Sequence, residues 1–282
     1  EFYFKEGVTW ADITTKSFAA RYAPQGFIFD VKGSSGFPDD SNREKVIALM
    51  NSRLMDGFMR ILNPTSTFQV GDMARVPFPK NIPNEAALKK NVKSLIKITA
   101  NDWDSFEDSW GFLSNPLIAG STETLALTKA FRKLMDSWRK SVSEVKELEE
   151  ENNRIFIDTY GLGAELSPEL SPDEITLTCN PNYRYGGSRN EEELENLLRC
   201  DTLRELVSYS IGCMMGRYSL DKPGLILASQ GETLQDYLRK IPSPRFAPDD
   251  DGILPLTDQE WFVDDATNRF LEFVRVVWGD EY

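Results

Sequence analysis

The chain has 282 residues, of which 40% are hydrophobic and 27% charged, so it can bury a core and is not a disordered segment. It contains no histidine, which excludes a catalytic centre built on imidazole within this chain. Its net charge of −13, taken as a whole, argues against binding to nucleic acid. No run of about 18 apolar residues is present, so the sequence predicts no membrane span.

The charge is unevenly distributed along the chain. Residues 1–80 hold ten Lys/Arg and nine Asp/Glu, whereas residues 81–282 hold 22 and 36, so only the second part is too acidic to lie along phosphates. Cys179, Cys200 and Cys213 are an odd number without paired spacing, which predicts a reduced, cytoplasmic environment. The chain opens on the strand-like "EFYFKEG" without Met, and we expect it to be a piece of a longer protein.

The first forty residues alternate like strands. "VTWADITTKSFAARYA" and "GFIFDVKG" mix β-branched and aromatic residues with polar ones, whereas "GSSGFPDD" indicates a loop. A single helix is predicted from a cap at Ser41 or Asn42 to a stop at "NPT", Asn63–Thr65. "TFQVGDMARVPFP" then predicts a short strand, a turn at "GD" and an extended exit.

The remaining chain is predicted to be mainly helical. One helix runs from Asn84 to about Ala100, and a longer periodic run from Ser121 to Tyr160 carries an apolar stripe of coiled-coil type. With "EVKELEEENNR" solvated on its outside, this long helix is predicted to be a spacer or docking arm rather than a core element. Its stripe consists of Leu127, Phe131, Leu134, Trp138, Val142, Val145, Leu148, Ile155 and Phe156.

Two capping boxes predict where later helices begin. Asn190 and Glu193 open a helix that continues to about residue 216, and Thr257 and Glu260 open a last helix at Asp258–Trp278. Between them, "PGLILAS" predicts a buried strand and "ETLQDYLRKI" a short helix.

These elements predict an α+β fold, with a small mixed β-rich globule followed by a mainly helical region that includes a long spacer helix. We expect three domains, namely a globule at 1–80, a helical connector with the long helix at 81–165, and a mainly helical region at 166–282. Three tryptophans are predicted to be core or interface anchors rather than a ligand cage: Trp103, Trp110 and Trp138.

The stretch "ITLTCNPNYRYGG" contains Asn180-Pro181-Asn182-Tyr183, which resembles the Asn-Pro-Pro-Tyr loop of enzymes that methylate exocyclic amino groups of DNA bases. Such an enzyme also needs a Gly-rich turn for S-adenosylmethionine, and no such turn precedes this stretch. We therefore expect a non-catalytic turn in which Asn180 or Asn182 bonds to nearby backbone and the tyrosines pack on the helix at 190–216.

Two carboxylate clusters, "PDDDG" and "DDATNRF", could coordinate Mg²⁺ in a nuclease. No Pro-Asp…Glu-x-Lys-like motif accompanies them, so we expect solvated charge in a loop and at a helix N-terminus. The sequence thus predicts no metal ligand and no catalytic residue in this chain.

One long string is similar to a known protein family: "GVTWADITTKSFAARYAPQGFIFDVKGSSGFPDD…VIALMNSRLMDGFMRILNPTSTFQVGDMARVPFP". It resembles the target-recognition region of PglX-type adenine-specific DNA methyltransferases of BREX phage-defence systems. The resemblance covers nearly the whole chain, because "DWDSFEDSWGFLSNPL", "RIFIDTYGL", "YSIGCMMGRYSLDKPGLILA" and "ILPLTDQEWFVDDATNRFLEFVRVVWG" carry it too. More loosely, the string resembles specificity modules of restriction–modification enzymes.

This resemblance implies a parent enzyme that transfers a methyl group from S-adenosylmethionine to adenine N6 at a non-palindromic site. The family's cofactor and catalytic motifs lie N-terminal to the part seen here, so this segment is expected to bind neither cofactor nor flipped base unaided. The implied partners are double-stranded DNA, the N-terminal methyltransferase domain of the same protein and other BREX proteins.

Contacts to DNA are expected from strands and loops of the N-terminal globule, where Arg or Lys can read guanine and hydroxyls can bond to phosphates or bases. For each candidate alone, a solvated surface role is an equal alternative, and Arg21 could instead form a cation–π pair with Tyr22. Two other functions remain open: a helical platform that docks partner defence proteins, and a self-contained methyltransferase or nuclease. The candidate DNA contacts are Lys5, Thr14, Thr15, Lys16, Arg21, Tyr22 as an aromatic wall, Lys32 and Ser34.

Overall fold

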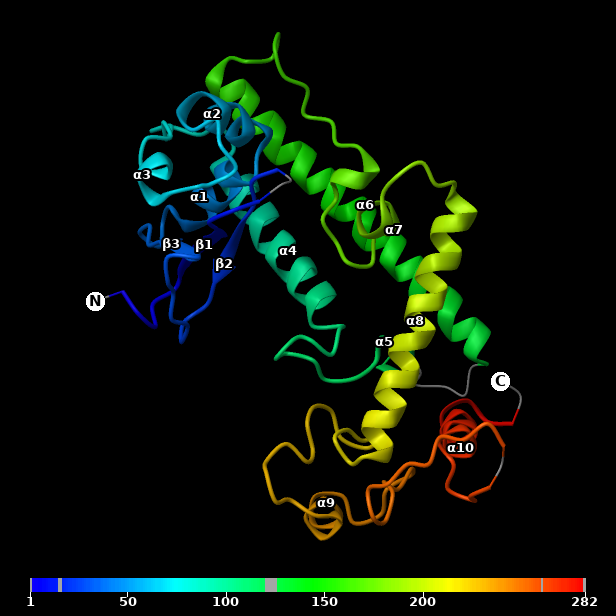
Figure 1. Ribbon diagram of the computed structural model, residues 1–282. Helices are drawn as coiled ribbons and strands as arrows, with labels where there is room; N and C mark the ends of the chain where they lie inside the picture. The colour runs from blue at the N-terminus through cyan, green and yellow to red at the C-terminus, as the bar shows by residue number, and fades with distance from the viewer. Residues whose placement is uncertain (1, 15–16, 120–125, 260, 281–282) are drawn as a thin grey trace. The chain divides into compact units, whose positions relative to one another are not determined.

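The computed structural model describes residues 2–14, 17–119, 126–259 and 261–280. A three-stranded antiparallel sheet near the N-terminus is followed by helices, so the predicted α+β class is confirmed (Figure 1).

The chain forms two compact units, and each unit draws on two stretches of sequence. Unit 1 comprises Glu1–Thr99 and Ser143–Ile175, and unit 2 comprises Ala100–Val142 and Thr176–Tyr282. Two of the three boundaries between the units fall inside helices, α4 (Glu85–Trp103) and α6 (Leu127–Tyr160), and the third lies between Ile175 and Thr176. The three domains predicted from the sequence, at 1–80, 81–165 and 166–282, have boundaries that differ from those of the two units, and they stay a prediction.

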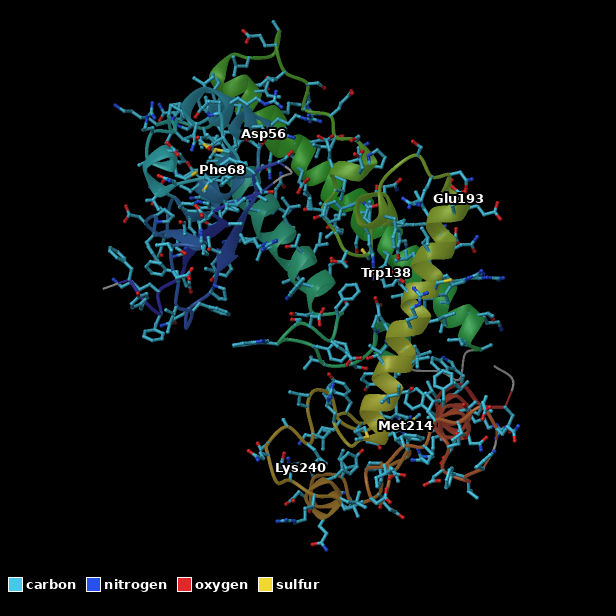
Figure 2. All side chains as sticks on the ribbon, viewed as in Figure 1. Asp56, Phe68, Trp138, Glu193, Met214 and Lys240 are labelled. Carbon is cyan, nitrogen blue, oxygen red and sulfur yellow. The ribbon has the colours of Figure 1, made fainter. Side chains whose placement is uncertain are left out.

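The sheet of unit 1 has the strand order β2-β1-β3, with both pairs antiparallel. Alternation in β1 places Val8 and Trp10 in the core, and the Trp10 indole N–H donates to the Phe68 carbonyl at 2.9 Å. Phe68 lies among the elements of unit 1 (Figure 2). The strands are β1 (Gly7–Ala11), β2 (Ala20–Ala23) and β3 (Gly33–Gly36).

The third strand lies where the sequence indicates a loop. "GFIFDVKG" was predicted to be a strand, but Phe27, Ile28 and Val31 are exposed, and the pairing segment is "GSSG". The two backbones approach closely at one point, because a Cβ added to Gly7 of β1 would lie only 2.7 Å from the Gly36 carbonyl oxygen. This pairing therefore requires glycine at position 7.

The helix predicted over 42–62 is divided in two by a tertiary contact. The Asn51 amide donates to the Ala20 carbonyl at 3.0 Å, and its oxygen accepts from the Ala20 N–H at 2.9 Å. Ser52 then adopts an extended conformation and starts the second helix. The "GD" predicted as a turn lies instead inside a short helix. The helices of this stretch are α1 (Arg43–Met50), α2 (Arg53–Leu62) and α3 (Val70–Met73).

Unit 2 is helical in the part that the structure describes, and its core lies where α8 meets α10. Met214 at the end of α8 belongs to this core (Figure 2), together with Tyr209, Phe273 and Trp278. The helices that lie wholly within the unit are α5 (Pro116–Ala119), α7 (Pro181–Tyr185), α8 (Glu191–Met214), α9 (Leu234–Lys240) and α10 (Ala266–Trp278). A 3-10 turn, η1 (Pro172–Glu174), belongs to unit 1.

Helix capping explains why one predicted helix start in unit 2 is confirmed and another is wrong. The Asn190–Glu193 capping box is confirmed, with the two reciprocal bonds at 2.9 and 3.0 Å. The last helix begins at Ala266 rather than near residue 258, because the Asp265 carboxylate accepts from the Thr267 N–H at 2.8 Å and caps it there. Glu260 of the predicted capping box lies outside the described residues.

The "PGLILAS" stretch is not a strand. Its residues have no ladder partner, Leu225 is 58% exposed, and only Ile226 is buried deeply, against Tyr237 of α9. A short apolar run of this kind also fits a loop that buries a single side chain, which here is Ile226.

The long helix contributes to the hydrophobic core of each unit. Ile155 and Phe156 are buried in the unit 1 core, and Phe131 and Leu134 pack against the unit 2 core. Its predicted first residues, 121–125, lie outside the described residues. The 34 residues of α6 span about 51 Å at 1.5 Å per residue.

Two asparagines within "EVKELEEENNR" were expected to be solvated but are buried. Asn152 accepts from the Asn91 amide at 3.1 Å, and Asn153 accepts from the Arg53 N–H at 3.0 Å. Of the three predicted tryptophan anchors, Trp138 is buried in the fold, whereas Trp103 and Trp110 are 57% and 98% exposed.

Candidate nucleic-acid interface

The solvent-facing side of the sheet presents one polar row across all three strands. Arg21 of β2 and Ser35 of β3 both pair with Thr9 of β1. Thr9 and Ser35 are half-buried, and their hydroxyls donate to backbone carbonyls at 3.0 and 3.3 Å. Arg21 is exposed, so its guanidinium is the cation of this row.

Arg21 and Tyr22 lie on opposite faces of the sheet, because successive strand residues alternate. Tyr22 packs against the unit 1 core, and burial together with Glu6 raises the pKa of its phenol. Ser34 also faces inward, is 7% exposed, and lies across from Trp10. The two-sided arrangement separates Arg21 from the Tyr22 ring and keeps its guanidinium in solvent.

The remaining described candidates lie in loops around the sheet. Lys32 is exposed and its ammonium lies 2.9 Å from the Asp12 carboxylate, an exposed pair of small energetic weight. Lys5 lies over the Phe2 ring at 5.0 Å from its centroid. Thr14 is half-buried, and its N–H donates to the Ser66 carbonyl. Two further candidates, Thr15 and Lys16, lie outside the described residues.

An open pocket of about 570 Å³ adjoins β3. Its walls combine carboxylates, hydroxyls and apolar side chains, including an Asp30 carboxylate that accepts from the Lys32 and Gly33 N–H groups at 2.9 Å. These two backbone bonds lower the pKa of Asp30. The lining residues are Tyr3, Asp12, Phe29, Asp30, Val31, Ser34, Ser35, Gln69 and Val70.

An aromatic cluster beside this pocket was missed from the sequence. Phe2 stacks on Phe37 with centroids 5.0 Å apart, and Phe29 lies 5.0 Å from Tyr3 and 5.2 Å from Phe37. Phe2 and Tyr3 are about half exposed. The closely spaced aromatic residues of "EFYF" and "GFIFD" could have predicted this cluster, but the same spacing is also typical of a strand. Partly exposed rings of this kind can stack on bases or sugars.

The Asn180–Tyr183 stretch forms the start of α7 in unit 2. Asn180 is 1% exposed, and its side-chain oxygen accepts from the Asn182 N–H at 3.1 Å, so it is the N-cap. Tyr185 donates to Asp201 of α8 at 2.8 Å, and Arg184 lies 3.0 Å from Glu205 of α8. The predicted bond from Asn180 to nearby backbone is present and Tyr185 contacts α8, but the stretch forms a short helix rather than a turn, and its non-catalytic role stays a prediction.

Replacing Asn180 with alanine should destabilise unit 2 by about 1 to 2 kcal/mol, because α7 loses its cap. Asn180→Ser keeps an oxygen acceptor and should recover most of this loss. Urea unfolding of the wild type and both variants measures the two effects. An equal loss of stability in Asn180→Ser and Asn180→Ala would show that the cap bond does not stabilise unit 2.

The described residues supply no metal cluster, and two of the three cysteines, Cys179 and Cys213, are buried. No group of three or more Cys, Asp or Glu side chains among the described residues is placed to hold a metal ion. Burial raises the pKa of the Cys179 thiol, which keeps it protonated. Asp249 of "PDDDG" accepts from the Gly252 N–H at 2.8 Å and thereby closes its own loop.

Over the ranges that the structure describes, no helix combines the length and apolar character needed to cross a membrane. The predicted cytoplasmic location stays a prediction.

Comparison with known proteins gives no matching family model but two curated relatives. The chain is 37% identical over 286 aligned positions to adenine-specific methyltransferase BrxX of Escherichia coli O9:H4 (strain HS), covering 100% of this chain and 23% of that protein. It is 34% identical over 287 positions to adenine-specific methyltransferase PglX of Lacticaseibacillus casei (strain Zhang), covering 100% of this chain and 22% of that protein. The chain spans less than a quarter of each relative, and it is related over its whole length to one segment of the BrxX and PglX proteins.

Proposed function

We propose that this chain is the DNA target-recognition segment of a longer, site-specific adenine-N6 DNA methyltransferase of a BREX phage-defence system. The observation that carries the proposal is the match of the whole chain to one segment of two proteins named adenine-specific methyltransferases. An enzyme that methylates one adenine in a defined site must read the neighbouring bases through groove contacts. The exposed side of the sheet in unit 1 supports this role.

The proposed readout uses Arg21 as the base-reading group. A guanidinium on a short antiparallel ribbon can enter the major groove and donate two hydrogen bonds to guanine O6 and N7. The hydroxyls of Thr9 and Ser35 flank it on the same face and can turn to bases or phosphates. Lys5 and Lys32 lie in the surrounding loops and suit phosphate contacts.

The proposed mechanism divides the labour between parts of one protein. S-adenosylmethionine binding, base flipping and methyl transfer belong to a methyltransferase domain outside this chain, and this chain supplies orientation and sequence choice. Double-stranded DNA and that domain are the proposed partners, and other BREX proteins are candidates. The capped, buried state of Asn180 supports the absence of a catalytic loop here.

A second candidate is a helical platform that docks partner defence proteins. α8 and its C-cap residue Met215 expose an apolar row at four-residue spacing. The row consists of Leu203, Val207, Ile211 and Met215, each 38% to 46% exposed. Such a row suits a partner helix or another apolar surface. The platform accounts for the acidic second part of the chain and does not require the sheet to touch DNA.

Exchange of residues 1–80 separates the two candidates. The exchange is made in the complete native protein, with the matching segment of a relative that methylates a different site. The methylated site should change to that of the donor, because the base-reading face moves with the segment. Sequencing of methylated DNA from the host measures it. Methylation that continues at the original site would favour the platform.

Point variants sharpen the same experiment and avoid the risk of a misfolded chimera. Arg21→Ala should relax recognition at one base position and weaken binding by about 5- to 150-fold, the effect of losing one bidentate contact. Arg60→Ala, at an exposed arginine of α2, is the matched control and should change neither. Equal effects of the two variants would remove Arg21 from the proposed readout.

A further inference from the structure

A basic row runs along the solvent-facing side of α4 in unit 1. Lys90, Lys93 and Lys97 follow each other at spacings of three and four residues, which places them on one helix face, and all three are exposed. The opposite face packs into the unit 1 core through Leu88 and Val92. The helix is therefore anchored on one side and presents three ammonium groups on the other.

This row is an exception in an acidic chain. From residue 80 to residue 97 the sequence contains five lysines and one glutamate, against a net charge of −13 for all 282 residues. The single Glu85 lies before the row and is engaged by Lys89 at 2.7 Å and by Lys45 at 3.4 Å. From 86 to 99 the helix carries no carboxylate, so the row forms a positive strip.

Within the row, Lys93 forms a weak ion pair. The Lys93 ammonium lies 3.7 Å from the Glu44 carboxylate, and the Lys93 side chain is 70% exposed. An exposed pair at this distance contributes little and can be exchanged for a phosphate. Glu44 belongs to α1, which packs against β1 and β2, so the row borders the same helix that supports the sheet.

We propose that Lys90, Lys93 and Lys97 bind the phosphate backbone of the double-stranded DNA that the sheet of unit 1 reads. This inference rests on the proposed function. From Lys90 to Lys97 the helix rises about 10 Å, and phosphates follow each other along one strand at about 3.4 Å of helix axis, so three ammoniums match about three phosphates. Lysine is a point charge on a flexible stem, so the row holds DNA without reading its sequence.

The test is the salt dependence of DNA binding by the complete native protein that carries this chain. The variant Lys90→Gln, Lys93→Gln and Lys97→Gln keeps helix propensity and removes three charges. Log affinity against log salt should become shallower by about 2 to 3, since each lost phosphate contact removes about 0.9. At 50 mM salt, binding to target and non-target duplexes should fall equally, by about 10- to 100-fold. The methylated site should stay the same.

A matched control removes three charges from another helix. Lys129→Gln, Arg132→Gln and Lys140→Gln, on exposed positions of α6 in unit 2, should leave affinity and slope near those of the wild type. An unchanged slope in the α4 variant, or an equal change in the control, would show that the row is only a solvated face.

The outcomes also distinguish this inference from the proposed function. If exchange of residues 1–80 moves the methylated site while the α4 variant binds normally, only the backbone contact is wrong. If the slope falls but the exchange leaves the site unchanged, the row holds DNA and the sheet does not select the sequence.

Discussion

Replacing Phe156 with alanine should lower the free energy of unfolding of unit 1 by about 4 kcal/mol, the loss typical of a large side chain removed from a packed core. Phe156 is fully buried and lies on α6 between Ile155 and Ile157, in a core shared with the sheet and with α1 and α2. If the long helix were only a spacer, truncation of one of its side chains would cost far less. The variant therefore decides whether α6 is structural in unit 1.

Hydrogen exchange of backbone amides measures this effect unit by unit. Amides of α1 and α2 should lose protection in Phe156→Ala, whereas amides around Leu206 in the core of unit 2 should keep theirs. Phe156→Leu retains most of the volume and should recover more than half of the loss. A loss below about 1 kcal/mol would contradict the core role, because only sites that collapse or are exposed tolerate such a truncation.

Elements with local signals are predicted from this sequence, and elements decided by distant contacts are not. The Asn190–Glu193 capping box is complete within four residues, so the start of α8 follows from the sequence alone. The break between α1 and α2 does not, because Asn51 exchanges hydrogen bonds with Ala20, which lies 31 residues earlier. Nothing within the helical pattern itself marks that residue as a break.

The same distinction between local signals and distant contacts applies to the residues of the candidate interface. Alternation in "AARYA" already places Arg21 away from the core, because Ala20 and Tyr22 flank it. The side of Ser34 could not be predicted, since it depends on the pairing of "GSSG" with β1, and a shift of one residue reverses every side chain. The register itself depends on the close contact of Gly7 with Gly36, which involves residues 29 positions apart.

Glu149 of α6 in unit 1 carries a carboxyl group with a raised pKa. Burial, with a smaller contribution from the nearby Glu174 carboxylate, raises this pKa from its ordinary value of 4.5 to about 7. Glu174 is itself bound by Arg53 at 2.8 Å. Between pH 4.5 and 7 the folded chain holds a proton on Glu149 that the unfolded chain has already released.

The sign of the pH dependence follows from this difference. Unfolding releases a proton in that range, so the contribution of Glu149 to stability is most favourable at low pH and declines as pH rises towards 7. Above pH 7 the ionised, partly buried carboxylate destabilises unit 1 by at most about 3 kcal/mol, since one pKa unit corresponds to about 1.4 kcal/mol.

Glu149→Gln should therefore stabilise unit 1 at pH 8 by about 2 to 3 kcal/mol and leave its stability nearly unchanged at pH 4.5. The amide keeps the shape of the protonated acid and cannot ionise, so only the cost of the buried charge is removed. Urea unfolding of both proteins at several pH values measures the difference, and the comparison cancels the titration of other carboxylates. Glu144→Gln removes the same charge from an exposed position of α6 and should show no such pH dependence. A change of equal size at both pH values would mean that Glu149 has the same pKa in the folded and the unfolded chain, which would contradict the effect of burial.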